Sequence, residues 1–215
     1  MPSHRPRAET RRLSLVVILL LAWLAGCAVV PPAASQATSP ATPSPTITAT
    51  PTPSPTKPTG PRLPTADDAL DVASFDNVHF ASPTGRIWCA MSADWTLCHF
   101  PKGMNMAKVP KSSSVCPGSG LDVTGVSVGT TAEYFCSGGA EALPQTNGLN
   151  VDWWKSTGFG SVKYDGQKLA ILPYGKKLMH APFVCESAEA GVSCGNLDSH
   201  KGFRVSAKGV EFLKK

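Results

Sequence analysis

The chain has 215 residues, of which 42% are hydrophobic and 16% are charged, and its formal net charge is +5. This length leaves room for a domain with a hydrophobic core, and the modest charge excludes the dense basic face of a typical nucleic-acid-binding protein. Seven cysteines and twenty prolines stand out in the composition, and their positions divide the chain into three parts.

The first 26 residues have the composition of an export signal. Four arginines and one glutamate precede the apolar run 13–24, which is shorter than the about 20 apolar residues that a transmembrane helix needs. The run ends at Leu24-Ala25-Gly26-Cys27, which looks like the bacterial lipobox. We therefore predict a lipoprotein signal peptide over residues 1–26, cleavage before Cys27, and lipidation of that cysteine. The alternative is an uncleaved signal anchor.

Residues 27–65 form the lipidated cysteine and a linker rich in proline, threonine and serine. Such a stretch has no side chains from which to build a core, so we predict a disordered spacer with extended, polyproline-like conformations. An O-glycosylated stalk is the alternative. Cleavage of the signal would leave 16 basic and 14 acidic residues, a net charge of +2, so we expect no nucleic-acid partner.

Residues 66–215 have the size of one domain and hold an even number of cysteines, namely Cys89, Cys98, Cys116, Cys136, Cys185 and Cys194. An even count in an exported chain favours disulfides over free thiols. The spacing does not match that of zinc ligands, and we expect neither a metal nor a cofactor.

The separation of the cysteines predicts which of them pair. Cys89 and Cys98 are nine residues apart, as are Cys185 and Cys194, and short polar stretches that fit turns lie between the members of each pair. An odd separation places both cysteines directly opposite each other in an antiparallel hairpin. We therefore predict the bridges Cys89–Cys98 and Cys185–Cys194, which leaves Cys116 to pair with Cys136.

The rest of this part reads as short strands separated by glycine, proline and asparagine. The expected strands cover residues 78–80, 121–128, 133–136, 161–164, 168–172 and 203–206, whereas residues 209–213 are expected to form a terminal turn or short helix. The predicted fold is mainly β, a small disulfide-bonded antiparallel β barrel or sandwich with little helix.

Three groups of short strings carry a resemblance to a known family. They are Phe80-Ala81-Ser82-Pro83-Thr84-Gly85-Arg86-Ile87-Trp88-Cys89, Leu172-Pro173-Tyr174-Gly175, and Gly191-Val192-Ser193-Cys194 with His200-Lys201-Gly202-Phe203-Arg204-Val205-Ser206. Together they resemble an uncharacterised family of actinobacterial exported proteins and lipoproteins, a domain of unknown function, over most of residues 75–213. The resemblance implies no activity, and the segment 147–167 is longer than the family pattern.

That longer segment holds the most suggestive candidate for a binding surface, Trp153 and Trp154. Consecutive side chains of an extended chain face opposite sides, so one indole could be exposed and stack on a sugar ring or contact a protein. The favoured alternative places one ring in the core and the other over a hydrophobic edge.

Catalytic residues have weaker support. Four histidines could include a general base and four serines offer hydroxyls, but no GxSxG motif accompanies them: His79, His99, His180, His200, Ser82, Ser137, Ser193 and Ser199. We therefore expect a cell-envelope lipoprotein, anchored to the outer side of the cell membrane through Cys27, that acts as a non-catalytic binding or structural module for an envelope protein, glycan or lipid. The alternative is a hydrolase of cell-envelope polymers.

Overall fold

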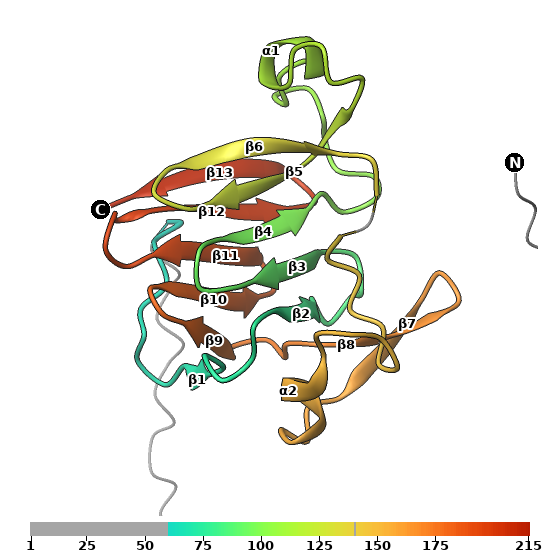
Figure 1. The fold of residues 1–215 in the computed structure, drawn as a ribbon, viewed down its shortest axis with the longest axis vertical. Coiled ribbons are helices and arrows are strands. Elements are labelled where there is room, and N and C mark those ends of the chain that lie inside the picture. The colour runs from blue at the N-terminus through green and yellow to red at the C-terminus, as the bar shows by residue number, and fades with distance from the viewer. Residues whose placement is uncertain (1–59, 140) are drawn as a thin grey trace, which may run out of the picture. The chain divides into compact units, whose positions relative to one another are not determined.

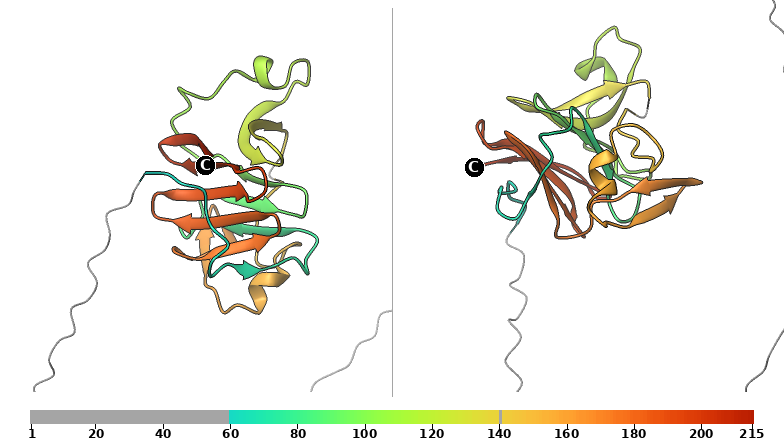
Figure 2. Two further views of the ribbon diagram at one scale, coloured as in Figure 1. Left: turned by 90° about the vertical axis from the view of Figure 1, so that its left-hand side faces the viewer. Right: turned by 60° about the horizontal axis from the view of Figure 1, so that its bottom comes forward.

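The computed structural model describes residues 60–139 and 141–215, which form a mainly β domain with little helix. Cys27, the signal and most of the linker lie outside the described residues. Two large sheets form the body of the domain, and Figure 2 shows them as two layers. None of the helices in the described part of the chain is long and apolar enough to cross a membrane.

The first layer is a five-stranded sheet with the order β2-β3-β4-β5-β6, in which every neighbouring pair is antiparallel. Its strands are β2 (Val78–Ala81), β3 (Trp88–Met91), β4 (Thr96–His99), β5 (Asp122–Val128) and β6 (Ala132–Ser137).

The second layer is a six-stranded sheet with the order β1-β9-β10-β11-β12-β13, antiparallel except that β1 runs parallel to β9. Its strands are β1 (Leu70–Asp71), β9 (Lys177–His180), β10 (Phe183–Ala188), β11 (Gly191–Asn196), β12 (Lys201–Ser206) and β13 (Gly209–Lys214). The labels in Figure 1 follow these strands through both layers.

The hydrophobic core lies between the two sheets. Alternate residues of each strand face the other layer, and each fully buried Leu or Phe contributes about 1.5–3 kcal/mol. A row of fully buried side chains crosses each sheet, namely Phe80, Cys89, Cys98 and Val126 in one and Leu178, Cys185, Cys194 and Phe203 in the other. The two sheets do not close into a barrel. Of the two predicted forms, barrel and sandwich, the described residues adopt the sandwich.

The three disulfides join Cys89 to Cys98, Cys116 to Cys136, and Cys185 to Cys194, which are the pairs predicted from the spacing. The two hairpin bridges join residues directly opposite each other, with Cα–Cα distances of 4.0 and 4.1 Å. The third ties the residue after α1 (Ser112–Val115) to β6. Three disulfides in one domain indicate an extracytoplasmic compartment, because the cytoplasm keeps thiols reduced.

A two-stranded hairpin of β7 (Ser161–Tyr164) and β8 (Gln167–Ala170) extends from the five-stranded sheet beside β2 (Figure 1). Its turn is Asp165-Gly166, with φ of 48° and 76°, and Asp-Gly is favoured where both turn residues need positive φ. The helix α2 (Asp152–Lys155) precedes the hairpin. This part of the fold corresponds to the long segment 147–167.

Residues 61–65, here called the tether segment, pack on the outer face of the six-stranded sheet. Gly195 and Gly202 are directly opposite each other on β11 and β12, and both point away from the core. Their missing side chains leave space for Leu63, because a methyl group on either glycine would lie within 2.7 Å of Leu63 Cδ2. Packing therefore begins before residue 66, the predicted start of the domain.

The expected strands are present, with small shifts at their ends, but the prediction for residues 209–213 is wrong. These residues belong to β13, which pairs with β12 from Gly209↔Ser206 to Lys214↔Lys201. The turn Ala207-Lys208 folds the chain back onto β12, whose backbone supplies the hydrogen-bonding partners. Five residues are too few for their own sequence pattern to specify a strand. Pairing with β12 therefore decides their conformation.

Candidate functional site

The candidate site is a groove of about 360 Å³ on the outer face of the five-stranded sheet. Trp88 of β3 and His99 of β4 come from the sheet itself, each next to an inward-facing cysteine. Arg86, Phe100 and Lys102 come from adjoining loops, and the remaining lining residues are Met106, Thr124, Gly139, Tyr164 and Asp165. The groove thus lies where the 100–106 loop and the β7–β8 hairpin approach the sheet.

Gly85 holds the β7–β8 hairpin against this groove. It has φ of +72°, and a methyl group at this position would lie 2.6 Å from Tyr164 Cβ, so both its conformation and its contact require glycine. The carbonyl oxygen of Gly85 accepts a hydrogen bond of 2.7 Å from the indole N–H of Trp88. Trp88 and Tyr164 then meet edge to face, with ring centroids 6.3 Å apart. Two aromatic rings are therefore fixed on one side of the groove.

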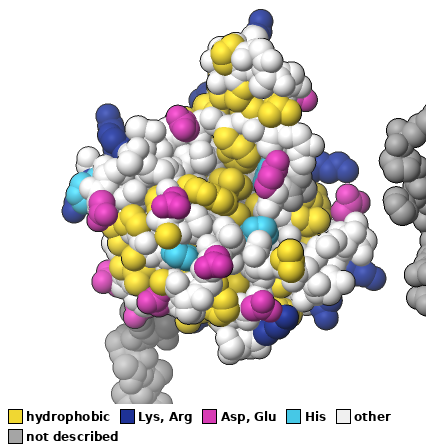
Figure 3. Space-filling model, viewed as in Figure 1, with side chains coloured by type: hydrophobic (Ala, Val, Ile, Leu, Met, Phe, Trp, Pro, Cys, Tyr) yellow, Lys and Arg dark blue, Asp and Glu magenta, His cyan; other side chains and the backbone are white. Residues whose placement is uncertain are grey.

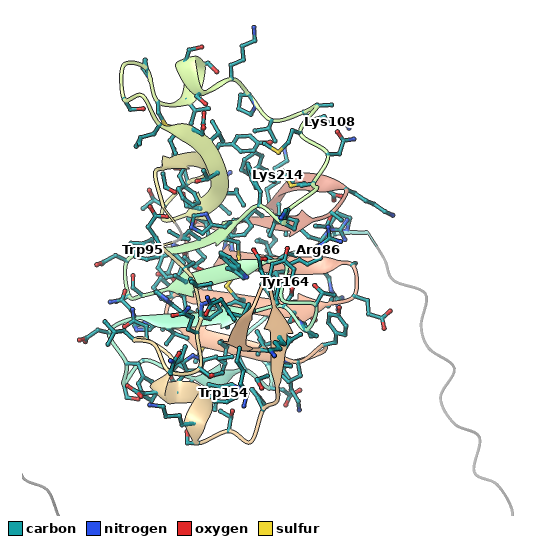
Figure 4. The ribbon with its side chains drawn as sticks, turned by 90° about the vertical axis from the view of Figure 1, so that its right-hand side faces the viewer. Arg86, Trp95, Lys108, Trp154, Tyr164 and Lys214 are labelled. Carbon is teal, nitrogen blue, oxygen red and sulfur yellow. A yellow bond between two sulfur atoms is a disulfide. The ribbon has the colours of Figure 1, made fainter. Side chains whose placement is uncertain are left out.

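Two cationic side chains lie beside these rings. Arg86 and Tyr164 are labelled in Figure 4, and both line the groove. A guanidinium N–H of Arg86 donates a hydrogen bond to the carbonyl oxygen of Lys102, which positions the arginine across the loop. Since a guanidinium has five N–H donors, others remain for a ligand. Among the described residues that line the groove, two side chains are cationic, Arg86 and Lys102, and one is acidic, Asp165.

His99 is held at the floor of the groove by an aromatic neighbour. Gly125 of β5 lies between His99 and Phe135 in the sheet, and it carries no side chain. The ring of Phe135 occupies the space above Gly125 and reaches the imidazole, with centroids 5.3 Å apart and an interplanar angle of 75°. His99 is consequently only 8% exposed.

His99 also meets a carboxylate. Its Nε2 lies 3.1 Å from Glu141 Oε2, although the pair is not aligned as a hydrogen bond. Burial lowers the pKa of His99, and the nearby charge of Glu141 only partly opposes this effect. Burial acts to raise the pKa of Glu141, but hydrogen bonds from its own backbone and Ser137, with the charge of His99, lower it overall. The neutral imidazole is therefore the favoured form at neutral pH.

Among the described residues, His99 has no hydroxyl partner of the kind that a nucleophilic serine or threonine would supply. A histidine that activates a serine or threonine must hydrogen-bond to that hydroxyl, and no such bond to His99 occurs within residues 60–139 and 141–215. The hydroxyl of Thr124, which lines the groove, bonds to that of Ser137 at 3.0 Å. Over the same residues, no group of three or more metal-ligating side chains comes together.

The two tryptophans chosen from the sequence lie elsewhere. Trp153 is 1% exposed, and its indole N–H donates to the carbonyl oxygen of His79 at 2.9 Å. Trp154 is partly buried against the core and donates to the carbonyl oxygen of Gly160 at 2.8 Å. This is the favoured alternative from the sequence, with one ring in the core and one covering its edge. Neither residue lines the groove.

The other catalytic candidates are dispersed. His79 contacts Asn150, His180 donates from Nε2 to the carbonyl oxygen of Phe75, and His200 is exposed in a turn. Across the described residues, none of the four candidate serines hydrogen-bonds to a histidine: Ser82, Ser137, Ser193 and Ser199.

Sequence reasoning considered His99 but missed its partners in the groove. Arg86 and Trp88 stand in the string from Phe80 to Cys89, but the sequence analysis assigned no binding role to either residue. Lys102 has no local signal, and Tyr164 stood out in the sequence only as an aromatic residue near Trp153 and Trp154, because loop and hairpin packing bring both to the sheet.

Comparison with known proteins gives no further assignment, since no family model, curated protein or solved structure matches the chain.

Proposed function

We propose that this chain is a cell-envelope lipoprotein whose domain is a non-catalytic binding module. The observation that carries the proposal is the lining of the groove, in which Trp88 and Tyr164 lie beside Arg86 and Lys102. Aromatic rings offer large, rigid apolar surfaces that fit the apolar faces of sugars, and arginine pairs with carboxylate or phosphate. An acidic glycan of the envelope combines both kinds of group, and we propose it as the ligand.

The location of the domain supports an envelope ligand. Three disulfides indicate an extracytoplasmic domain, and the lipobox-like string before Cys27 supports a lipid anchor in the cell membrane. The anchor is tested by the intact mass of the protein from native membranes. We expect a chain that begins at acylated Cys27 and six further cysteines that alkylate only after reduction.

Binding is tested by calorimetric titration of the full chain with uronic-acid oligosaccharides, using neutral hexose oligosaccharides of the same length as the comparison. We expect binding to the acidic series only. Arg86→Gln should weaken it by about 10-fold or more, because hydrogen bonds to charged groups contribute about 1.5–3 kcal/mol. Lys176→Gln removes the same charge at an exposed turn outside the groove and should leave affinity unchanged. Equal loss in both variants contradicts the proposed site.

A hydrolase is the second candidate, and one observation favours it. His99 lies at the floor of the groove beside Glu141, and burial lowers its pKa. The same titration mixtures are therefore assayed for new reducing ends. Release of reducing ends by the unaltered chain, and its loss in His99→Gln, would assign a hydrolase in place of a binding module.

A further inference from the structure

A second cavity, of about 310 Å³, lies where the tether segment meets the end of β13. Residues 61–65 form one wall, and the turn after β11 with Lys214 and Lys215 forms the other. It belongs to the outer side of the six-stranded sheet and shares no residue with the groove. In Figure 3, histidine, basic and acidic side chains lie near one another at the edge where Figure 1 places the C-terminus.

The charged groups that line this cavity share one sign. They are Arg62, Lys214 and Lys215, and no Asp or Glu side chain is among the described residues that line it. Within the described ranges, no ion pair occupies Arg62, Lys214 or Lys215.

The hairpin that supplies Lys214 pairs like charges at this end. Lys201 of β12 is directly opposite Lys214 of β13, a like-charged pair that destabilises a sheet when nothing neutralises it. Three residues further along β12, Arg204 is opposite Glu211 of β13, and the two form an ion pair of 2.8 Å. The strand pair thus matches opposite charges in its middle and places two lysines opposite each other at its end, of which Lys214 lines the cavity and Lys201 does not.

Apolar groups complete the wall of the cavity. Leu63, Pro64 and Leu197 line it together with the cationic residues. A small inorganic ion would use only the charges, whereas an amphiphilic anion would also cover the apolar wall. The phosphate end of a phospholipid, with the glycerol and first acyl carbons behind it, has this combination of groups.

We propose that this cavity binds the phosphate group of an anionic phospholipid headgroup. The assignment of the phosphate to a membrane lipid rests on the proposed anchor at Cys27, because the tether segment that walls the cavity is the part of the domain nearest to that residue in the chain. The cavity chemistry itself does not depend on the groove. Binding there would bring the six-stranded sheet toward the membrane surface and leave the groove on the other sheet.

The test uses the full chain with Cys27→Ser, which cannot be acylated, and vesicles of phosphatidylcholine with or without 30% phosphatidylglycerol. Residues 13–24 remain in this chain and can contact lipid, so the measured quantity is the ratio of the two affinities. We expect phosphatidylglycerol to be preferred. Lys214→Gln/Lys215→Gln should reduce the preference by about 10- to 30-fold, which is what two lysines near an anionic surface supply.

The matched control is Lys163→Gln/Lys168→Gln, which removes two charges from another pair of directly opposed lysines, on the β7–β8 hairpin. It should change the preference less than twofold. Equal loss in both double variants means attraction by overall charge and overturns the site. Arg62→Gln, outside every strand, is the second cavity variant should the lysine pair fail to fold.

A second arm distinguishes lipid from soluble phosphate, with sn-glycerol 3-phosphate as the probe. Competition with vesicle binding supports a phosphate site that reaches lipid. Binding of the soluble probe without any preference for phosphatidylglycerol vesicles overturns the lipid assignment. Since the mass measurement tests the anchor at Cys27 and Arg86→Gln tests the groove, failure of either leaves a result here that can be read separately.

Discussion

Cys98 Sγ lies 3.9 Å from Cys194 Sγ, so the two hairpin disulfides meet in the middle of the core. The two cysteines hold the same place in two similar meanders. Across β2 to β6 the facing residues are Phe80, Cys89, Cys98, Val126 and Tyr134. Across β9 to β13 they are Leu178, Cys185, Cys194, Phe203 and Phe212. The ends of the two rows also touch, since the rings of Tyr134 and Phe212 are 5.2 Å apart.

The buried bridges should stabilise the domain more than the peripheral one. Loop entropy alone ranks them the other way, at about 2.7 kcal/mol for Cys89–Cys98 and about 3.3 kcal/mol for Cys116–Cys136. The sulfurs of Cys89 and Cys98 are fully buried, however, and their removal leaves a cavity. We expect Cys89→Ala/Cys98→Ala to lose about 5 kcal/mol of unfolding free energy and Cys116→Ala/Cys136→Ala about 3 kcal/mol in urea denaturation. The reverse order would mean that loop entropy dominates.

Gly85→Ala should displace the β7–β8 hairpin and open the groove. The added methyl group lies 2.6 Å from Tyr164 Cβ, and a positive φ costs alanine about 1–2 kcal/mol in addition. Gly158→Ala is the matched control, because Gly158 has φ of +67° with nothing within 4 Å of the added methyl group. We expect Gly85→Ala to lose at least 1 kcal/mol more than the control and to weaken ligand binding. Equal losses would show that only the backbone conformation matters.

Gly202→Ala should release the tether segment. Its methyl group would meet the backbone of Cys194 and lie 2.5 Å from Leu63 Cδ2. We expect faster proteolysis at residues 60–66, measured by mass spectrometry of limited digests. Gly160→Ala is the control, because its nearest contact is 3.7 Å away at Ile171 Cδ1. Unchanged cleavage in Gly202→Ala would show that Leu63 is held by other contacts.

The stability of the domain should fall as the pH drops below about 6.5, the ordinary pKa of histidine. Burial lowers the pKa of both His79 and His99, so the unfolded chain binds more protons than the folded chain in this range. The free energy of unfolding therefore rises with pH in the range just below 6.5. The contribution of the two histidines to it is lost as the pH falls through that range. We expect a lower urea midpoint at pH 5.5 than at pH 7.5.

The double variant His79→Asn/His99→Asn should flatten this dependence, whereas His200→Asn, at an exposed position, should not. Glu141, whose pKa is lowered overall, affects stability only below its ordinary value of 4.5, outside the measured range. A midpoint that is the same at both pH values in the unaltered chain would contradict the assignment.

The cysteine pairs could be predicted because strand geometry links sequence separation to facing positions. The nine-residue spacing from Cys89 to Cys98 and from Cys185 to Cys194 allows the two residues of each pair to lie opposite each other across a short turn, as they do. The strand at Gly209 was missed for the opposite reason. This strand is stabilised by pairing with β12, and the sequence of residues 209–213 alone does not indicate that they pair with β12.

The candidate site could not be predicted because its residues meet only in the folded chain. Trp88 and His99 lie on the neighbouring strands β3 and β4. Tyr164 belongs to the β7–β8 hairpin, 65 residues after His99 in the sequence. The basic cavity has the same origin. Lys214 and Lys215 look like an isolated pair in the sequence, and only the packing of the tether segment on the sheet brings Arg62 to them.

The packing of Leu63 against Gly195 and Gly202 also has a mechanical consequence. Tension along the linker would enter the domain through the tether segment and act on β11 and β12, which lie inside the six-stranded sheet and not at its edge. The Cys185–Cys194 bridge ties β11 to β10 and spreads that force over a third strand. Because the groove is on the other sheet, such a force would reach the groove only through the core.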